Sequence, residues 1–374
     1  METLFWLSIG FVVYVYAGYP ALLAAAVRLR QRRYQLSGVS CQGAGRNQER
    51  DRNQELPGVT VILAARNEAE RLPGRIANLL ASDYPRDRMQ IIVASDGSTD
   101  DTVDVLARYR QRITLLQLPP RGKAAALNAA VWQARHPILV FADARQRFAR
   151  DAIRRLVAGF TDSRVGAVSG ELVIDCEHSA DAAERSTIGD GVGAYWKYEK
   201  WLRHREGVVD STIGVTGAIY AMRRWLWQPL PTDAILDDLL GPMRIVQRGY
   251  RVVFQPAARA FDHAASDAGT ELRRKVRTLA GNFQLLRYEP HFLVPGRNPV
   301  WLQFVSHKLG RLLVPYALIA VLVSNAFLLS SGIFYALTFA AQVAFYGLAA
   351  YGALLDQRAR VTPADAGEVV REAA

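Results

Sequence analysis

Acidic residues adjoin apolar runs at three places in the sequence. Asp96 ends the run IIVASD, Asp143 follows ILVFA, and the adjacent pair Asp237-Asp238 precedes a helical pattern over 239–247. Open α/β sheets bind ligands at the carboxyl ends of their strands, so Asp96 and Asp143 are candidates for ligand contacts. Adjacent carboxylates raise one another's pKa, which prepares one of them to accept a proton. The simpler alternatives are a turn residue at Asp96 and a helix N-cap at Asp237 or Asp238.

Lys123 is a further residue with a clear chemical use. It follows Arg121-Gly122 at the start of a helical pattern, where its ammonium group and the free amides of the helix can meet a phosphate. The chain has 46 Lys and Arg residues but only five lysines, which favours a compact point charge at this position. The alternative is a solvated loop lysine.

Strand and helix patterns alternate between residues 59 and 142. The predicted strands are 59–65, 90–94, 113–116 and 137–142, and the clearest helical patterns are 72–80 and 124–134. Polar residues at the strand ends predict a mostly parallel sheet with one ligand edge. Ser98 and Asp101 have capping-box spacing before the helical pattern that begins near residue 102. No GxGxxG follows the first strand, which argues against a dinucleotide-dependent dehydrogenase.

Long uncharged stretches flank this region. Residues 3–27 are long enough for one transmembrane helix, and they lack the basic start of a cleaved signal peptide. The arginines that follow place the next segment in the cytoplasm. The second stretch fits two transmembrane helices, 312–330 and 333–355, with a turn near Ser330-Ser331-Gly332.

The remaining segments have simpler patterns. Residues 37–56 predict a flexible linker, 356–374 a cytoplasmic tail, and 290–311 an interfacial helix or a simple connector. The formal net charge is +11, but the arginines are spread along the chain, so no nucleic-acid partner is expected. Cys41 and Cys176 have no metal or redox spacing and are expected to be free thiols.

Seven segments together resemble family 2 glycosyltransferases. They are VTVILAARNEAERL, VASDGSTDDT, GKAAALNAA, VFADARQRF, GVTGAIYAMRR, LDDLLGPMRIVQRGYRV and RRKVRTLAGN. The resemblance is to the membrane-anchored, inverting branch that contains cellulose, chitin and hyaluronan synthases and bacterial exopolysaccharide transferases. It implies an α/β domain of the GT-A class over 57–285, Rossmann-like with a mostly parallel sheet, facing the cytoplasm between N- and C-terminal transmembrane helices.

The resemblance also implies roles for the residues that match the family's motifs. Ala65, Glu68 and Asp96 would bind the nucleotide of a nucleotide-diphosphate sugar, with Asp96 on the base, and Lys123 would meet its phosphates. Asp143 would hold Mg²⁺ or Mn²⁺.

Further along the chain, the resemblance assigns the acceptor side. Asp238, with Asp237 beside it, would take the acceptor proton. Thr216-Gly217-Ala218 matches the acceptor-side loop, and Arg277 would brace the diphosphate.

Three positions depart from the family's pattern. Arg274 replaces the glutamine of the QxxRW motif. Arg145 stands at the second acidic position of the DxD metal motif, so the ion rests on fewer protein oxygens or Arg145 itself holds phosphate. Thr278 replaces the tryptophan of the QxxRW motif, which normally stacks on a sugar of the growing chain, so processivity is in doubt. His263 is a surface histidine or an added metal ligand. If the resemblance is set aside, the sequence around Arg277 predicts a basic amphipathic helix that lies on an anionic membrane.

The leading expectation is an inverting sugar transferase at the cytoplasmic face of the inner (plasma) membrane. Its donor is a nucleotide-diphosphate sugar, with UDP favoured, and its acceptor is a glycan or a lipid-linked molecule. Membrane lipid and export or synthase proteins are further expected partners. The alternatives are single-sugar transfer to a polyprenyl phosphate and a non-catalytic relative that binds a nucleotide sugar beside a synthase.

Overall fold

The computed structural model describes residues 1–36, 56–175, 187–263 and 268–361. Most of the predicted linker and the end of the predicted tail therefore lie outside the described residues. The chain divides into two compact units, one made of Met1–Tyr19 with Leu309–Ala374 and the other of Pro20–Lys308. Each unit is described below by itself.

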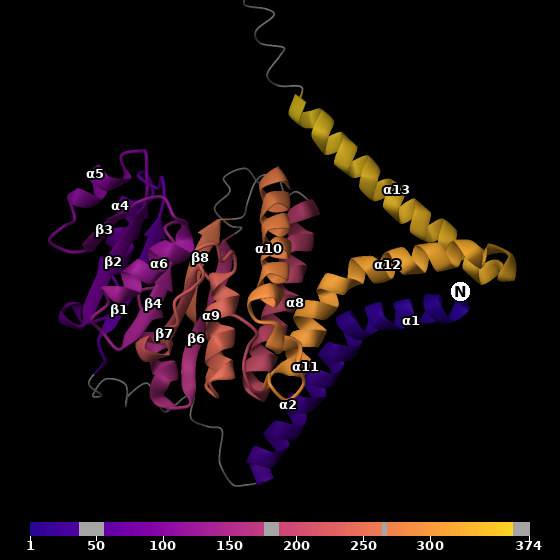
Figure 1. The fold of residues 1–374 in the computed structure, drawn as a ribbon, viewed down its shortest axis with the longest axis horizontal. Helices are drawn as coiled ribbons and strands as arrows, with labels where there is room; N and C mark the ends of the chain where they lie inside the picture. Colours follow the sequence, from indigo (N-terminus) through magenta and orange to yellow (C-terminus); the bar gives the residue numbers. More distant parts are fainter. Residues whose placement is uncertain (37–55, 176–186, 264–267, 362–374) are drawn as a thin grey trace, which may run out of the picture. The chain divides into compact units, whose positions relative to one another are not determined.

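A single mixed sheet forms the centre of the larger unit (Figure 1). Within the described residues it has eight strands in the order β3-β2-β1-β4-β7-β6-β8-β5. Their bounds are β1 Val59–Ala65, β2 Met89–Asp96, β3 Thr114–Leu118, β4 Ile138–Ala142, β5 Arg147–Phe148, β6 Val165–Asp175, β7 Ile219–Arg223 and β8 Arg251–His263. The strands β1 to β4 run parallel, as predicted, whereas β7 pairs antiparallel with both β4 and β6.

The parallel strands are apolar on both faces because helices cover both sides of the sheet. In β1, Val61 and Leu63 pack into one hydrophobic cluster and Ile62 packs into the other. The first cluster includes α4 (Leu72–Leu80), α5 (Thr102–Ala107) and α7 (Ala152–Ala158), and the second includes α6 (Lys123–Trp132) and α9 (Asp237–Gln247). The sheet and helices place the carboxyl ends of β1, β2 and β4 at one edge.

Two predicted helix starts are wrong in detail. Asp101 is the N-cap of α5 and makes no side-chain cap hydrogen bond. The capping box fails because Ser98 Oγ accepts a hydrogen bond from the backbone N–H of Asn67, in another loop, at 3.1 Å. The helix α9 begins at Asp237 rather than at residue 239, and its N-cap is Leu236, without a side-chain cap hydrogen bond. The acidic pair thus lies in the first turn of α9, where the helix dipole favours negative charge.

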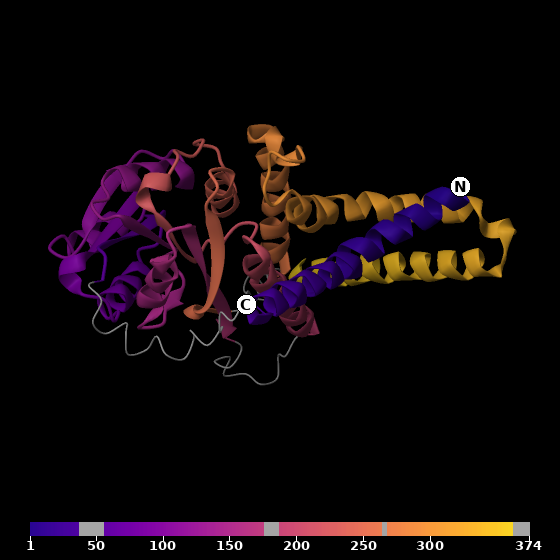
Figure 2. The same ribbon diagram turned by 90° about the horizontal axis from the view of Figure 1, so that it is seen from below.

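The smaller unit contains long apolar helices. The helices α12 (Gly310–Phe327) and α13 (Ile333–Val361) form a hairpin around the 3₁₀ turn Leu329–Ser331. The helix α1 (Glu2–Val13) packs against α12 (Figure 2). Three helices of the described chain are long and apolar enough to cross a membrane, and they span Glu2–Arg30, Trp301–Phe327 and Ile333–Gly352. The chain is therefore a candidate membrane protein with three spans.

The segment predicted as an interfacial helix over 290–311 is not one helix. The chain forms a 3₁₀ turn at Pro290–Leu293, a non-helical stretch, and a helical run that starts at Trp301. Pro295, Gly296 with φ +81°, and Pro299 interrupt the helix. The run from Trp301 passes through a π-helical turn, Phe304–Leu309, before α12.

Candidate active site

Lys123 joins two of the predicted acidic residues. It is the first residue of α6, and its Nζ lies 3.3 Å from Asp143 Oδ1 and 3.4 Å from Asp237 Oδ2. The side chain of Asp237 is 7% exposed, whereas those of Lys123 and Asp143 are each 38% exposed. The end of β4 and the starts of α6 and α9 therefore bring three predicted site residues together, with Asp143 and Lys123 open to a ligand.

The charges of this cluster change the protonation of its members. Burial would lower the pKa of Lys123, but Asp237, Asp143 and Asp238 outweigh burial and raise the pKa well above its usual value. Burial and the neighbouring Asp237 raise the pKa of Asp238 to about 6, while Lys123, Lys308 and Arg203 oppose that rise. Asp238 is thus able to exchange a proton near neutral pH, as a general base requires.

Asp96 has a structural partner at the edge of the sheet. One of its oxygens accepts hydrogen bonds from the backbone N–H of Arg121 at 2.7 Å and of Gly122 at 3.1 Å. The residue is 5% exposed. Gly122 has φ +92°, a left-handed conformation that favours glycine. Asp96 therefore fixes the loop that delivers Lys123, and part of its hydrogen-bonding capacity is already used.

The loops that follow β1 and β2 are joined to each other. Asn67, at φ +55°, accepts a hydrogen bond from the backbone N–H of Thr99 at 2.8 Å. The backbone N–H of Glu68 donates to Thr102 Oγ1 at 2.9 Å, and the Glu68 carboxylate pairs with Arg71 at 2.8 Å. Ala65 lies at the end of β1, opposite Ser95. The predicted nucleotide-binding residues Ala65 and Glu68 thus share one edge with Asp96.

The residues around Asp143 fit a metal ion only together with substrate oxygens. Arg145 pairs with Asp262 of β8, and Gln146 Nε2 donates to the same Asp262 oxygen at 2.9 Å. No group of three or more His, Cys, Asp or Glu suited to a metal occurs among the described residues, and the side chain of His263 is outside them. One carboxylate at Asp143 suits Mg²⁺ or Mn²⁺, since Mg²⁺ is usually held by one or two carboxylates and substrate phosphates.

Arg277 is not brought to this cluster. It lies on α10 (Ala268–Tyr288) with an exposed side chain, and the described residues show no contact between it and the carboxylates. Thr278 Oγ1 donates to the carbonyl of Arg274 in its own helix at 2.9 Å. The helix does approach the site further on, because a Cβ at Gly281 would lie 2.5 Å from Leu236 Cγ. The diphosphate-bracing role of Arg277 stays a prediction.

Several residues of this site were missed by sequence reasoning. Tyr220 of β7 is buried, stacks on Phe141 with ring centroids 4.5 Å apart, and has a pKa raised by burial and by the three site aspartates. Asp262 pairs with Arg145, and Arg203 contacts the loop at Thr216. Tyr220 lies inside a recognised segment, which was the available signal. Arg203 and Asp262 lie outside the recognised segments, so the sequence offered no such signal for them.

The mixed, mostly parallel sheet and the helices that cover it define a fold of the GT-A class. A similar solved structure is the mannosyltransferase PcManGT from Pyrobaculum calidifontis in complex with GDP-Man and Mn²⁺. The two chains share 23% sequence identity and a TM-score of 0.64, over 91% of this chain and 92% of that one. This likeness confirms the predicted fold class.

Sequence comparisons add a family match. Residues 60–227 match the family described as glycosyl transferase family 2, so the chain contains a domain similar to those of the family 2 glycosyltransferases. The poly-beta-1,6-N-acetyl-D-glucosamine synthase of Staphylococcus aureus (strain COL) is 27% identical over 62% of this chain and 56% of its own length. The probable glycosyltransferase YdaM of Bacillus subtilis (strain 168) is 24% identical over 67% of this chain and 61% of its own length.

Proposed function

We propose that this enzyme transfers a sugar, with inversion, from a nucleotide-diphosphate sugar to a glycan or lipid-linked acceptor. The observation that carries the proposal is the ion-paired cluster of Lys123, Asp143 and Asp237, with Asp238 beside it in the first turn of α9. An inverting reaction needs a cation at the leaving diphosphate and a base on the opposite face of the sugar. This cluster supplies both kinds of group.

Asp238 is the proposed base. Its carboxyl is partly buried, and burial together with Asp237 raises its pKa to about 6. Above that pH it is ionised and can accept the proton of an acceptor hydroxyl. Asp237 keeps the ion pair with Lys123 and so holds the first turn of α9 in place. Its role is to position Asp238 and to set its affinity for protons.

Lys123 is the proposed charge partner of the leaving diphosphate. Its raised pKa keeps the ammonium group protonated across the physiological range, and more than a third of its side chain is exposed. Asp143 would hold Mg²⁺ or Mn²⁺ together with phosphate oxygens. Such an ion, when bound, would supply Lewis-acid stabilisation of the departing diphosphate.

A screen of labelled nucleotide sugars tests this proposal. Detergent-solubilised protein is incubated with each of UDP-, GDP- and dTDP-sugars, with and without Mg²⁺ or Mn²⁺, and label in glycan and lipid fractions is counted. We expect metal-stimulated transfer from one donor by the wild type. We expect none from Asp143→Asn or Asp238→Asn, and wild-type transfer by either variant contradicts the assignment. Binding of the donor without turnover by the wild type would instead support a non-catalytic relative.

Addition of a single sugar is the second candidate function. The observation that favours it is Thr278, whose short side chain is hydrogen-bonded to its own helix where the processive relatives place a stacking tryptophan. Without a stacking tryptophan, the enzyme lacks one contact that would retain a growing glycan chain between additions. The size of the labelled product decides between the two candidates. Products of many sugars from one enzyme molecule would exclude single addition.

A further inference from the structure

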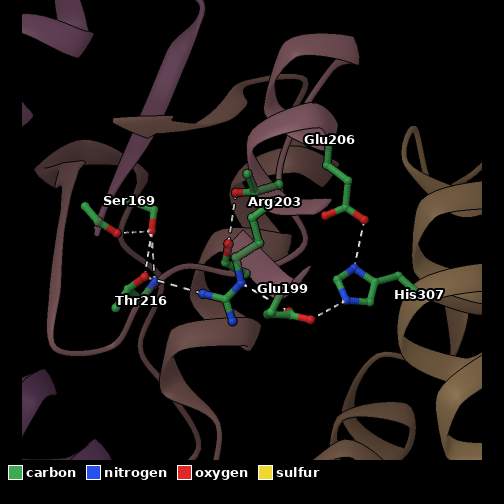
Figure 3. A network of polar contacts seen from close by, with 9 residues as sticks. Ser169, Glu199, Arg203, Glu206, Thr216 and His307 are labelled. Atoms are coloured by element: carbon green, nitrogen blue, oxygen red, sulfur yellow. Dashed lines mark hydrogen bonds and ion pairs between the residues drawn. The ribbon is translucent and has the colours of Figure 1, made fainter. Parts of the chain in front are cut away.

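A chain of buried and partly buried polar contacts links three segments of the larger unit (Figure 3). They are α8 (Thr187–Val209), the loop before β7, and the π-helical turn Phe304–Leu309. Arg203 of α8 lies between Thr216 of the loop and Glu199 of its own helix, and Glu199 in turn contacts His307 (Figure 3). Arg203, Glu199 and His307 lie outside the recognised motifs. Buried polar networks are costly unless they are satisfied, so this one calls for a function.

The first contact joins Arg203 to the acceptor-side loop. Arg203 Nη1 lies 3.4 Å from Thr216 Oγ1, and the backbone N–H of Thr216 donates to Ser169 Oγ at 2.9 Å. Thr216 and Ser169 are 8% and 1% exposed. The loop is thus held by hydrogen bonds from two sides, to the guanidinium group of Arg203 in α8 and to the hydroxyl group of Ser169 in β6.

The second contact joins this loop to the proposed base. The backbone N–H of Val215 donates to the carbonyl of Asp238 at 2.9 Å. A Cβ at Gly217 would lie 3.0 Å from Asp238 Oδ2, so the glycine lets the loop backbone pass close to the carboxyl. A shift of Thr216 therefore moves groups that touch Asp238 directly.

The third contact fixes Arg203 itself. Arg203 Nε lies 3.3 Å from Glu199 Oε1, and the other oxygen of Glu199 lies 3.2 Å from His307 Nε2. His307 Nδ1 lies 2.8 Å from Glu206 Oε1, one helical turn beyond Arg203. The side chains of His307 and Glu206 are 1% and 0% exposed. His307 therefore holds both glutamates of α8, and Glu199 presents Arg203 to the loop.

We propose that Arg203 is a positioning residue that holds the loop Thr216–Ala218 against Asp238, with Glu199 and His307 as its anchor. The inference rests on the proposed role of Asp238 as the base. Arg203 also adds positive charge to the field at Asp238, which is otherwise set by Asp237, Lys123, Lys308 and burial. Geometry and charge can be separated, because lysine keeps the charge of arginine and loses its planar fork.

Three variants test this inference in the full chain in nanodiscs. Arg203→Gln removes both the charge and the fork, and Arg203→Lys removes the fork alone. Arg205→Gln is the matched control, because Arg205 is two residues further along α8 and its guanidinium lies 3.8 Å above the ring of Trp201 instead. The assay uses the labelled donor identified by the screen and the acceptor that is present in native membranes. Hydrogen exchange of residues 213–219 gives a readout that does not depend on turnover.

The expected result separates positioning from general stability. Arg203→Gln should lower kcat by about tenfold to a hundredfold, since small misplacements of reacting groups have effects of that size, and should leave the donor KM unchanged. The acid limb of its pH–rate profile should move to higher pH, because Asp238 loses a nearby cation that lowers its pKa. Arg203→Lys should keep the wild-type acid limb with a reduced kcat. In both Arg203 variants, hydrogen exchange of residues 213–219 should be faster than in the wild type. Arg205→Gln should match the wild type in exchange and in kcat.

Two outcomes overturn the inference. Wild-type exchange over 213–219 in Arg203→Gln would show that Arg203 does not hold the loop. An equal loss of kcat in Arg205→Gln would show that the effect is one of helix stability. If the wild type itself transfers no sugar, the proposed function fails, whereas faster exchange in the Arg203 variants would still show that Arg203 holds the loop.

Discussion

At the scale of single residues, the site depends on opposite charges that share a small volume. Lys123 lies within 3.4 Å of two carboxylates from different elements, and Asp237 is almost completely buried. Removing one member leaves the others without compensation, which is more damaging in a buried site than at a surface. The following two predictions use this imbalance.

Replacement of Asp238 by Asn should abolish transfer and stabilise the protein. The pKa of Asp238 is raised to about 6 in the folded state, so ionisation of this carboxyl opposes folding. The folded protein binds the proton of Asp238 more tightly than the unfolded chain does. The stability gained from this tighter binding is fully present below the unfolded-state pKa and is lost as the pH rises through about 6. Asp238→Asn should therefore gain stability on the order of 1 kcal/mol at neutral pH and little under acidic conditions.

Thermal unfolding at several pH values measures this effect. The control is Asp104→Asn, which changes an exposed aspartate of α5. Equal changes in Tm for the two variants at neutral pH would contradict the burial and repulsion assigned to Asp238.

Replacement of Lys123 by Gln should weaken donor use and stability together. The change leaves Asp143 and Asp237 without their shared cation, and it removes the charge proposed to meet the diphosphate. We expect kcat/KM for the donor to fall by about a hundredfold or more, and Tm to fall at neutral pH because Asp237 is left buried without its partner. Steady-state kinetics and thermal unfolding measure the two effects, with the exposed Lys275→Gln of α10 as control. Wild-type donor kinetics in Lys123→Gln would contradict its role.

At the scale of elements, α10 packs on the segment just before the acidic pair. A Cβ at Gly281 would lie 2.5 Å from Leu236 Cγ, whereas nothing lies within 4 Å of a Cβ at Gly241 of α9. Gly281→Ala should therefore destabilise the protein by about 1–3 kcal/mol through overpacking. Gly241→Ala should stabilise it by about 0.4–1 kcal/mol, because alanine reduces the entropy of the unfolded chain. Chemical denaturation compares the two, and a gain in stability from both variants would contradict the contact between α10 and Leu236.

The elements differ in how far they could be predicted from sequence. The strand β1 has the predicted bounds, Val59–Ala65, because a run buried on both faces has a clear apolar signal. The capping box at Ser98 failed because the hydroxyl is used by Asn67 from a loop 31 residues away. The interfacial helix failed where Pro295, Gly296 and Pro299 follow one another. Local signals therefore predicted the elements, and competition from remote partners decided their ends.

The site shows the same division. Asp143, Lys123 and Asp237 were predicted from recognised motifs, and the fold brings them together. The partner of Arg145 was not predicted, because Asp262 is 117 residues away and its pairing depends on the position of β8. The sequence pattern indicated that Arg145 could not be a metal ligand. The structure adds that Arg145 is held by a carboxylate.

At the scale of the whole molecule, three apolar helices flank the enzyme domain in the sequence. We propose that the domain is cytoplasmic, since Arg28 and Arg30 end the first span and Arg358 and Arg360 follow the last. A fluorescent protein fused after Ala374 should be fluorescent, and alkaline phosphatase fused there should be inactive. The reverse pattern would contradict this orientation.

The pH dependence of kcat/KM for transfer tests the central claim most directly. If Asp238 is the base, activity must be lost as the pH falls through the pKa of its carboxyl, which burial and Asp237 raise to about 6. We predict an acid limb with an apparent pKa near that value, and no matching limb in donor binding. A rate that stays constant down to about pH 4.5 would mean that an unperturbed carboxyl or no carboxyl takes the proton, and would contradict the assignment of Asp238.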